Sequence, residues 1–175
     1  SESVFSIDSK ETSDYDDAFS IMKIGDNAYK LSIYIANVPI WMEELDLWNS
    51  FSDRISTIYL PDRKRPMMPA SLSNCVCSLC EKVVRLAFAI DITIINGEII
   101  GYKFENTYIN VYKNHVYESK ELKKDDNYKL MFHVVDELSQ IYKYTSTIKS
   151  SHDLVSYLMI LMNYYTALEM TKHNN

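Results

Sequence analysis

Four aspartates stand within ten residues near the start of the chain, between two apolar segments with the character of strands, residues 4–7 and 18–24. Carboxylates gathered at a strand end repel one another, and burial increases the penalty. A hard divalent cation removes that penalty, because carboxylate oxygens are its natural ligands. The pattern therefore predicts a magnesium site, for which manganese is a second possible occupant. The predicted ligands are Asp8, Asp14, Asp16 and Asp17.

A solvated acidic loop is the alternative, and it is the commoner fate of a short run of charge. The strand-like segments on either side distinguish this cluster from low-complexity sequence. The run contains no glycine, whereas an EF-hand loop requires one at its sharp turn, so a calcium loop of that kind is excluded.

Length and charge limit the possible functions. A chain of 175 residues is long enough for one domain with a real core. The formal net charge of −6 argues against broad binding to duplex nucleic acid, which depends on a basic surface. This charge does not exclude binding of single-stranded nucleic acid in a local groove, where bases can stack on some of the 14 tyrosines.

The three cysteines crowd into one short segment, as Cys75, Cys77 and Cys80. No second Cys-x-x-Cys pair is available to complete a zinc site. We therefore expect reduced, buried and inert thiols in an intracellular protein, and the polar, acidic start of the chain does not have the pattern of a signal peptide.

Hydrophobic periodicity predicts an α+β domain with a mixed or antiparallel sheet flanked by helices. Turn residues and alternating apolar residues predict the strands, and apolar residues at helical spacing predict the helices. We expect strands at residues 4–7, 18–24, 29–38, 85–95 and 98–112. We expect helices at residues 41–58, 128–144 (capped by Asp126 or Asn127) and 153–172.

The last predicted helix has almost no polar face, which is typical of a helix buried in a core or spanning a membrane. Its apolar run is at the short limit for a span, and Ser156 and Asn163 interrupt it. We therefore expect a buried helix and no membrane contact. Another chain, or a further C-terminal segment, is expected to cover it.

Several motifs occur in a fixed order along the chain. Asp8 is followed, after five residues, by Asp14-Tyr15-Asp16-Asp17-Ala18; then come Tyr59-Leu60-Pro61, Pro66-Met67-Met68-Pro69, Cys77-Ser78-Leu79 and His152-Asp153-Leu154-Val155. This combination resembles the RNB catalytic domain of ribonuclease II and ribonuclease R. The matches extend over most of the chain.

The resemblance implies a hydrolytic exoribonuclease that degrades single-stranded RNA from its 3′ end to nucleoside 5′-monophosphates. It implies that the four aspartates are catalytic and hold magnesium, that Tyr59 stacks on the terminal base, and that Tyr117 clamps the 3′ end. The basic run Arg63-Lys64-Arg65 is expected to bind backbone phosphates, with a solvated loop as the alternative.

Some positions depart from the family pattern. Its paired glutamates in the last helix are Ser156 and Tyr157 here, and a His and an Asp in the third strand are Tyr34 and Asn37. The family's Ser-Pro-Ile-Arg segment does not occur, so residues 1–175 are expected to be a partial RNB-like domain. The alternative function is therefore a degenerate, non-catalytic RNB domain that serves as an RNA-binding or assembly subunit. An acidic structural module without RNA contact is a third possibility.

Overall fold

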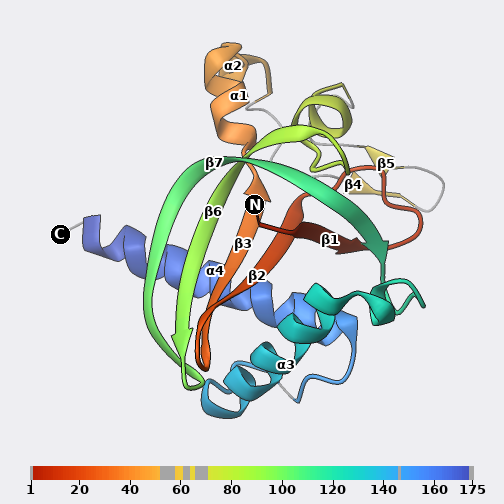
Figure 1. The fold of residues 1–175 in the computed structure, drawn as a ribbon. Helices are drawn as coiled ribbons and strands as arrows, with labels where there is room; N and C mark the ends of the chain where they lie inside the picture. Colours follow the sequence, from red (N-terminus) through yellow and green to blue (C-terminus); the bar gives the residue numbers. More distant parts are fainter. Residues whose placement is uncertain (1, 52–57, 61–63, 66–70, 146, 174–175) are drawn as a thin grey trace.

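The computed structural model of the chain describes residues 2–51, 58–60, 64–65, 71–145 and 147–173. Five strands form a closed barrel in the order β1-β2-β3-β6-β7 (Figure 1). They are β1 (Val4–Asp8), β2 (Asp17–Gly25), β3 (Ala28–Ala36), β6 (Val84–Ile95) and β7 (Glu98–Val116). The ring closes because β7 pairs with β1 in parallel, whereas the other four pairings are antiparallel. The predicted α+β class with a mixed sheet is confirmed; its closure into a barrel was not predicted.

Strands β6 and β7 were predicted closely because their connecting turn has a characteristic sequence. Asn96 and Gly97 both have positive φ, +52° and +79°, which is the backbone of a two-residue hairpin turn. Glycine adopts this region freely and asparagine tolerates it. Strand β7 continues four residues beyond its predicted end at Tyr112, to Val116, and this extension carries it to the end of β1.

The helix predicted over residues 41–58 is not continuous, and residues 52–57 of that range lie outside the described residues. The structure has two short helices there, α1 (Val38–Glu44) and α2 (Trp48–Phe51), and Ile58 already belongs to the strand β4 (Ile58–Tyr59). Asp46 lies between the helices with φ of +50°, a left-handed conformation that interrupts the helical hydrogen bonds. Asn37 caps α1 by accepting from the Ile40 amide at 3.5 Å, so the strand predicted to reach residue 38 ends at Ala36.

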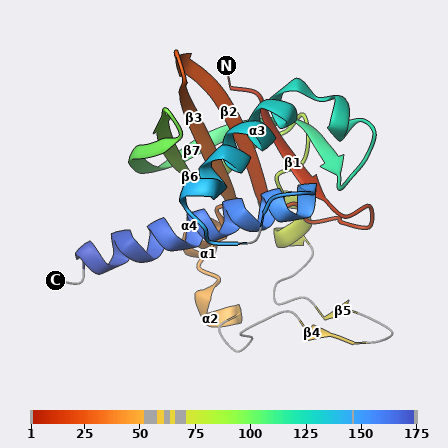
Figure 2. The same cartoon turned by 90° about the horizontal axis from the view of Figure 1, so that it is seen from below.

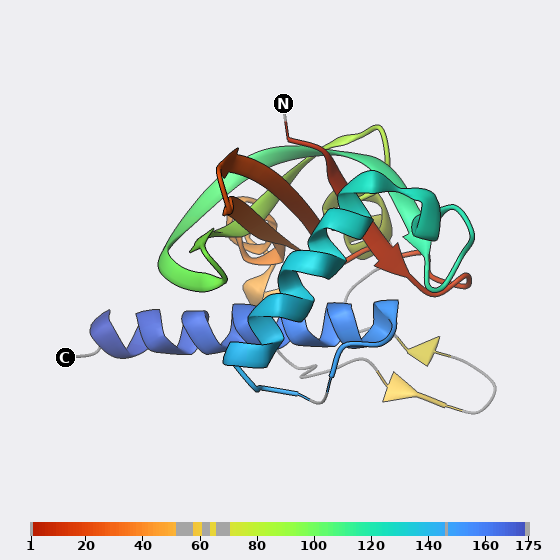
Figure 3. The same ribbon diagram turned by 60° about the horizontal axis from the view of Figure 1, so that its bottom comes forward.

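Two longer helices pack against the barrel, α3 (Asp126–Ile141) and α4 (Ser151–His173) (Figures 2 and 3). Both were predicted, but the cap of α3 is Asp125 rather than Asp126 or Asn127. Its Oδ1 atom accepts from the Tyr128 amide at 3.0 Å. The remaining elements are the strand β5 (Lys64–Arg65), which pairs with β4, the π-helical turn η1 (Ser71–Cys77) and the 3-10 turn η2 (Leu122–Lys124).

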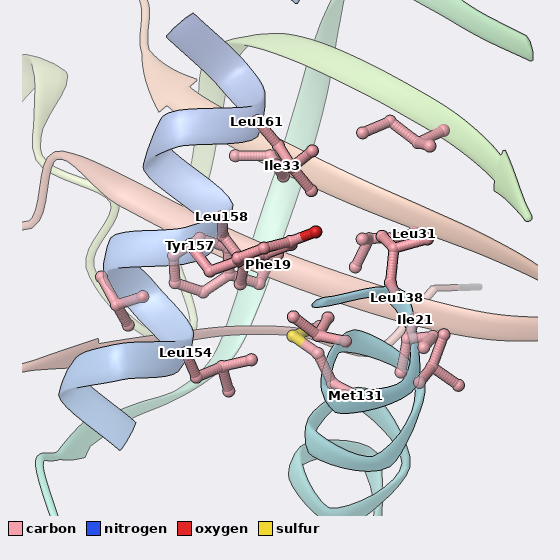
Figure 4. Close-up of a cluster of buried hydrophobic side chains, with 14 of the residues drawn as sticks. Phe19, Ile21, Leu31, Ile33, Met131, Leu138, Leu154, Tyr157, Leu158 and Leu161 are labelled. Carbon is pink, nitrogen blue, oxygen red and sulfur yellow. The ribbon is translucent and has the colours of Figure 1, made fainter. Parts of the chain in front are cut away.

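The main core lies between these helices and the large apolar side chains of the strands. In Figure 4, side chains of α4 point toward those of β2, β3 and α3. The labelled residues are Phe19, Ile21, Leu31, Ile33, Met131, Leu138, Leu154, Tyr157, Leu158 and Leu161. Fully burying one such side chain contributes about 1.5–3 kcal/mol, so this layer supplies much of the stability of the fold.

Helix α4 is buried on one face against the described residues, and its expected burial on the other face depends on the predicted covering segment or chain. Tyr164, Leu168 and Met170 on its other side are 47%, 37% and 61% exposed. Whether another segment or chain covers them stays a prediction. Within the described residues, no helix has the combined length and hydropathy needed to cross a membrane.

The cysteines also differ from expectation: Cys77 is buried, Cys80 is half-buried and Cys75 is exposed.

Candidate metal centre

The barrel brings three of the predicted site residues to one end. Asp8 is the last residue of β1, and Asp17 is the first residue of the antiparallel neighbour β2. Tyr117 directly follows β7, which runs parallel to β1 on its other side. The Tyr117 amide donates to the Asp8 carbonyl at 3.0 Å, so the ends of β1 and β7 are joined at this point.

The segment that carries Asp14 and Asp16 is pinned by its backbone. The Tyr15 amide donates to the hydroxyl of Ser78, which is fully buried, at 2.9 Å. The Tyr15 carbonyl accepts from the Leu79 amide at 2.8 Å, and the Asp16 carbonyl accepts from Ala36 at 2.8 Å. These three bonds hold the acidic segment in place against the mutual repulsion of its side chains. Sequence reasoning assigned no role to Ser78.

The carboxyl groups of the cluster raise one another's pKa values. Burial, together with the charges of Asp16 and Asp14, raises the pKa of Asp8 to about 6, although a hydrogen bond from Ser6 opposes the shift. Burial, followed by the charges of Asp8 and Asp16, raises the pKa of Asp17 to about 7. The structure therefore brings the four aspartates close enough to interact, and without a cation Asp8 and Asp17 take up protons at a higher pH than ordinary aspartates do.

The donor set suits a magnesium ion. Asp8 Oδ2 and Asp17 Oδ2 are both buried and have no hydrogen-bond partner. An unpaired buried carboxylate oxygen is unfavourable, and a cation with oxygen ligands would satisfy both atoms. Within the part of the chain that is described, no three His, Cys, Asp or Glu side chains are already gathered closely enough to hold a metal.

Tyr117 lies beside the acidic cluster and is paired with His152, which belongs to a motif of the family pattern but to which the sequence assigned no role. Burial and the charges of Asp17 and Asp8 raise the pKa of Tyr117 to about 12, so its phenol stays protonated at neutral pH. Its ring stacks on His152 with a centroid separation of 3.8 Å and an interplanar angle of 13°. No spacing in the sequence relates a residue that follows a strand to one in the first turn of a helix 35 positions later.

Three other predicted RNA-binding residues, Tyr59, Lys64 and Arg65, lie in a small two-stranded hairpin. Tyr59 in β4 pairs with Lys64 in β5, and Ile58 pairs with Arg65. Arg63 lies outside the described residues. In all three ribbon views the hairpin is on the side of the molecule toward which β1 runs (Figures 1, 2 and 3).

Of the positions that depart from the family pattern, Tyr157, Tyr34 and Asn37 make side-chain hydrogen bonds. Tyr157 is fully buried, and its hydroxyl donates to the Tyr142 carbonyl at 2.9 Å, so it is a core residue. Ser156 is exposed. The Tyr34 hydroxyl donates to Glu2 at 2.6 Å, and Asn37 donates to the Asn106 side chain at 2.8 Å.

A comparison with protein-family models gives a match to the RNB domain over residues 1–151. The chain belongs to the RNB-domain family. Its curated relatives include ribonuclease R of Mycoplasmopsis pulmonis, 38% identical over 153 residues that cover 79% of this chain and 20% of the relative. Ribonuclease R of Thermotoga maritima is 32% identical over 117 residues, covering 66% of this chain and 16% of the relative. The chain thus spans about a fifth of the length of these relatives.

Solved structures share the fold of this RNB-family chain. Mycoplasma genitalium RNase R in complex with ribose-methylated single-stranded RNA superposes with a TM-score of 0.81 at 22% identity, covering 98% of this chain and 33% of that one. The same protein is also solved in complex with double-stranded RNA. Yeast Ssd1, described as a pseudonuclease, superposes with a TM-score of 0.65 at 13% identity, covering 77% of this chain and 17% of that one.

Proposed function

We propose that this chain is the metal-binding part of an RNB-type exoribonuclease, which hydrolyses single-stranded RNA from its 3′ end to nucleoside 5′-monophosphates. The observation that carries the proposal is the pair of unpartnered, buried oxygens of Asp8 and Asp17 within a cluster of four aspartates. The RNB family is generally magnesium-dependent. Membership of this family supports the reaction class.

In this proposal Asp8, Asp14, Asp16 and Asp17 hold the magnesium ion. A bound magnesium ion supplies the Lewis acidity and positive charge that phosphodiester hydrolysis requires. The backbone bonds of Tyr15 and Asp16 fix the acidic segment before substrate arrives, so little reorganisation is needed.

The aromatic and basic residues are assigned to the RNA. The Tyr117 phenol is a hydrogen-bond donor at neutral pH and lies beside Asp8 and Asp17, where it can donate to an oxygen of the 3′-terminal nucleotide. Tyr59 would stack on a base, which suits an enzyme without sequence preference because every base has a π face. Arg63, Lys64 and Arg65 would neutralise backbone phosphates.

A degradation assay tests the proposal. A single-stranded RNA labelled at its 5′ end is incubated with the protein and magnesium or manganese, and shortening from the 3′ end is followed on a gel. We expect nucleotide-by-nucleotide loss that EDTA stops. Asp16→Asn is expected to lower the rate by at least about 100-fold, because a ligand of the charge-stabilising centre is lost.

Asp26→Asn is the matched control, since Asp26 is exposed in the β2–β3 turn, at the opposite end of β2 from Asp17. We expect this variant to degrade RNA at the wild-type rate. Equal rates for wild type and Asp16→Asn would contradict the assignment of the site.

A non-catalytic RNB domain that binds RNA or assembles with a partner is the second candidate function. It is favoured by Ser156 and Tyr157, which replace the paired glutamates of the family, and by the burial of Tyr157 in the core. In that case RNA binding would persist without any shortening, and Asp16→Asn would bind RNA as wild type does. Another chain seated on the exposed face of α4 would fit the same role.

A further inference from the structure

His152 and Tyr117 form a stacked pair at the edge of the acidic cluster. Their rings are nearly parallel, at 13°, with centroids 3.8 Å apart. His152 is exposed, and Tyr117 is half-buried. One face of the Tyr117 ring is therefore covered by an imidazole, so an incoming base or sugar meets its other face or its edge.

Hydrogen bonds join the backbone segments that carry the two rings. Glu118, directly after Tyr117, accepts from the Ser151 amide at 2.6 Å and from the Ser151 hydroxyl at 2.8 Å. The Glu118 amide in turn donates to the Ser151 hydroxyl at 3.1 Å. Ser151 is fully buried and immediately precedes His152. This reciprocal arrangement fixes the start of α4 against the end of β7.

A further hydrogen bond joins this segment to the acidic cluster, because the Tyr117 amide donates to the Asp8 carbonyl at 3.0 Å. The Tyr117 backbone is thus held from the Asp8 side, and its ring is held from the His152 side. A half-buried tyrosine with only backbone restraints could still rotate about its side-chain bonds. The stack on His152 limits that rotation.

We propose that His152 is a positioning residue, which holds the Tyr117 ring at the acidic cluster in the orientation that clamps the 3′-terminal nucleotide of RNA. This inference rests on the proposed function. It assigns to His152 an action through Tyr117 rather than a contact with the reacting atoms.

The pairing itself can be measured without RNA or metal. In the metal-free protein, the ring resonances of Tyr117, assigned by NMR with the help of Tyr117→Phe, are expected to be shifted by the ring current of the stacked imidazole. His152→Ala should remove that shift, and His152→Phe should keep a ring-current shift. His133→Ala is the matched control, since His133 is an exposed histidine on α3. Unchanged Tyr117 resonances in His152→Ala would overturn the pairing.

The effect on RNA is measured by fluorescence anisotropy in EDTA, with a 5′-labelled oligoadenylate that has a free 3′ hydroxyl. We expect His152→Ala to weaken binding about fivefold, in line with the strength of an aromatic pair, and His152→Phe to restore it. In the Tyr117→Ala background, removal of His152 is expected to have no further effect. An equal loss in both backgrounds, or failure of phenylalanine to restore binding, would overturn the positioning role.

These outcomes separate the inference from the proposed function. If wild type binds the oligoadenylate but never shortens it with magnesium, the exonuclease proposal fails. The positioning role is still supported in that case if His152→Ala weakens RNA binding only when Tyr117 is present. If wild type shortens RNA and His152→Ala binds it as wild type does, the positioning role fails alone. Absence of any binding by wild type contradicts both.

Discussion

Asp8 and Asp17 bind protons more tightly in the folded protein than in the unfolded chain. Burial and neighbouring carboxylates raise their pKa values from an ordinary 3.8 to about 6 and about 7. Between pH 4 and 7 the folded state therefore carries more protons than the unfolded state, and stability falls as pH rises through this window. Glu118 has the opposite shift, with its pKa lowered to about 2 by Lys123 and Ser151, and its contribution is lost only at acid pH.

We accordingly expect the Tm in EDTA to decrease between pH 5 and pH 8. After solvent screening the two shifts together correspond to about 1–3 kcal/mol of unfolding free energy. Magnesium should restore stability at pH 8 and have little effect at pH 5, where the carboxyl groups are protonated. Asp17→Asn should flatten the pH dependence. Thermal unfolding followed by circular dichroism checks this, and a Tm that rises from pH 5 to pH 8 in EDTA contradicts it.

Among the individual residues, the sequence singles out some candidate site residues and not others. The aspartates stand out because four carboxylates in ten residues after an apolar strand have few explanations. Ser78 and His152 lie in motifs of the family pattern, but the sequence does not show their contacts with Tyr15 and Tyr117, which are far away along the chain. Pairings of that kind are set by the tertiary fold, which local patterns do not encode.

Some secondary-structure elements were predicted closely from the sequence, and others were not. Strands with strong alternation and the Asn96-Gly97 turn were predicted closely, as was α4. The helix predicted over residues 41–58 is interrupted between α1 and α2, although its apolar residues have helical spacing. Hydrophobic periodicity indicates which side chains face a core. It does not indicate that a residue such as Asp46 has a left-handed backbone conformation.

The packing of α4 on the barrel gives a prediction for this element. Leu158 is fully buried among the side chains of the main core, whereas Leu168, three turns later, is 37% exposed. Leu158→Ala leaves a cavity and is expected to lower the free energy of unfolding by about 2–5 kcal/mol. Leu168→Ala should lower it by well under half as much. Urea unfolding of both variants provides the comparison, and equal losses would contradict the one-sided burial of α4.

For the molecule as a whole, the decisive feature is the parallel pairing of β7 with β1, which closes the barrel. It places Tyr117 next to Asp8, although 109 positions separate them in the chain. The antiparallel β1–β2 pairing adds Asp17 on the other side. Under the proposed function, this acidic chain of net charge −6 has its metal ligands at one end of the barrel, where a bound cation would offset the local charge.

The central claim is that the four aspartates form a binding site for a divalent cation. Calorimetric titration of magnesium into the metal-free protein at pH 8 tests it most directly, with Asp17→Asn and the surface variant Asp26→Asn measured in parallel. We expect saturable binding to wild type and Asp26→Asn and its loss in Asp17→Asn, because one of the two carboxyl groups with an unpartnered buried oxygen is then replaced by a neutral amide. Equal binding heats for wild type and Asp17→Asn, or no saturable binding to wild type, would contradict the account.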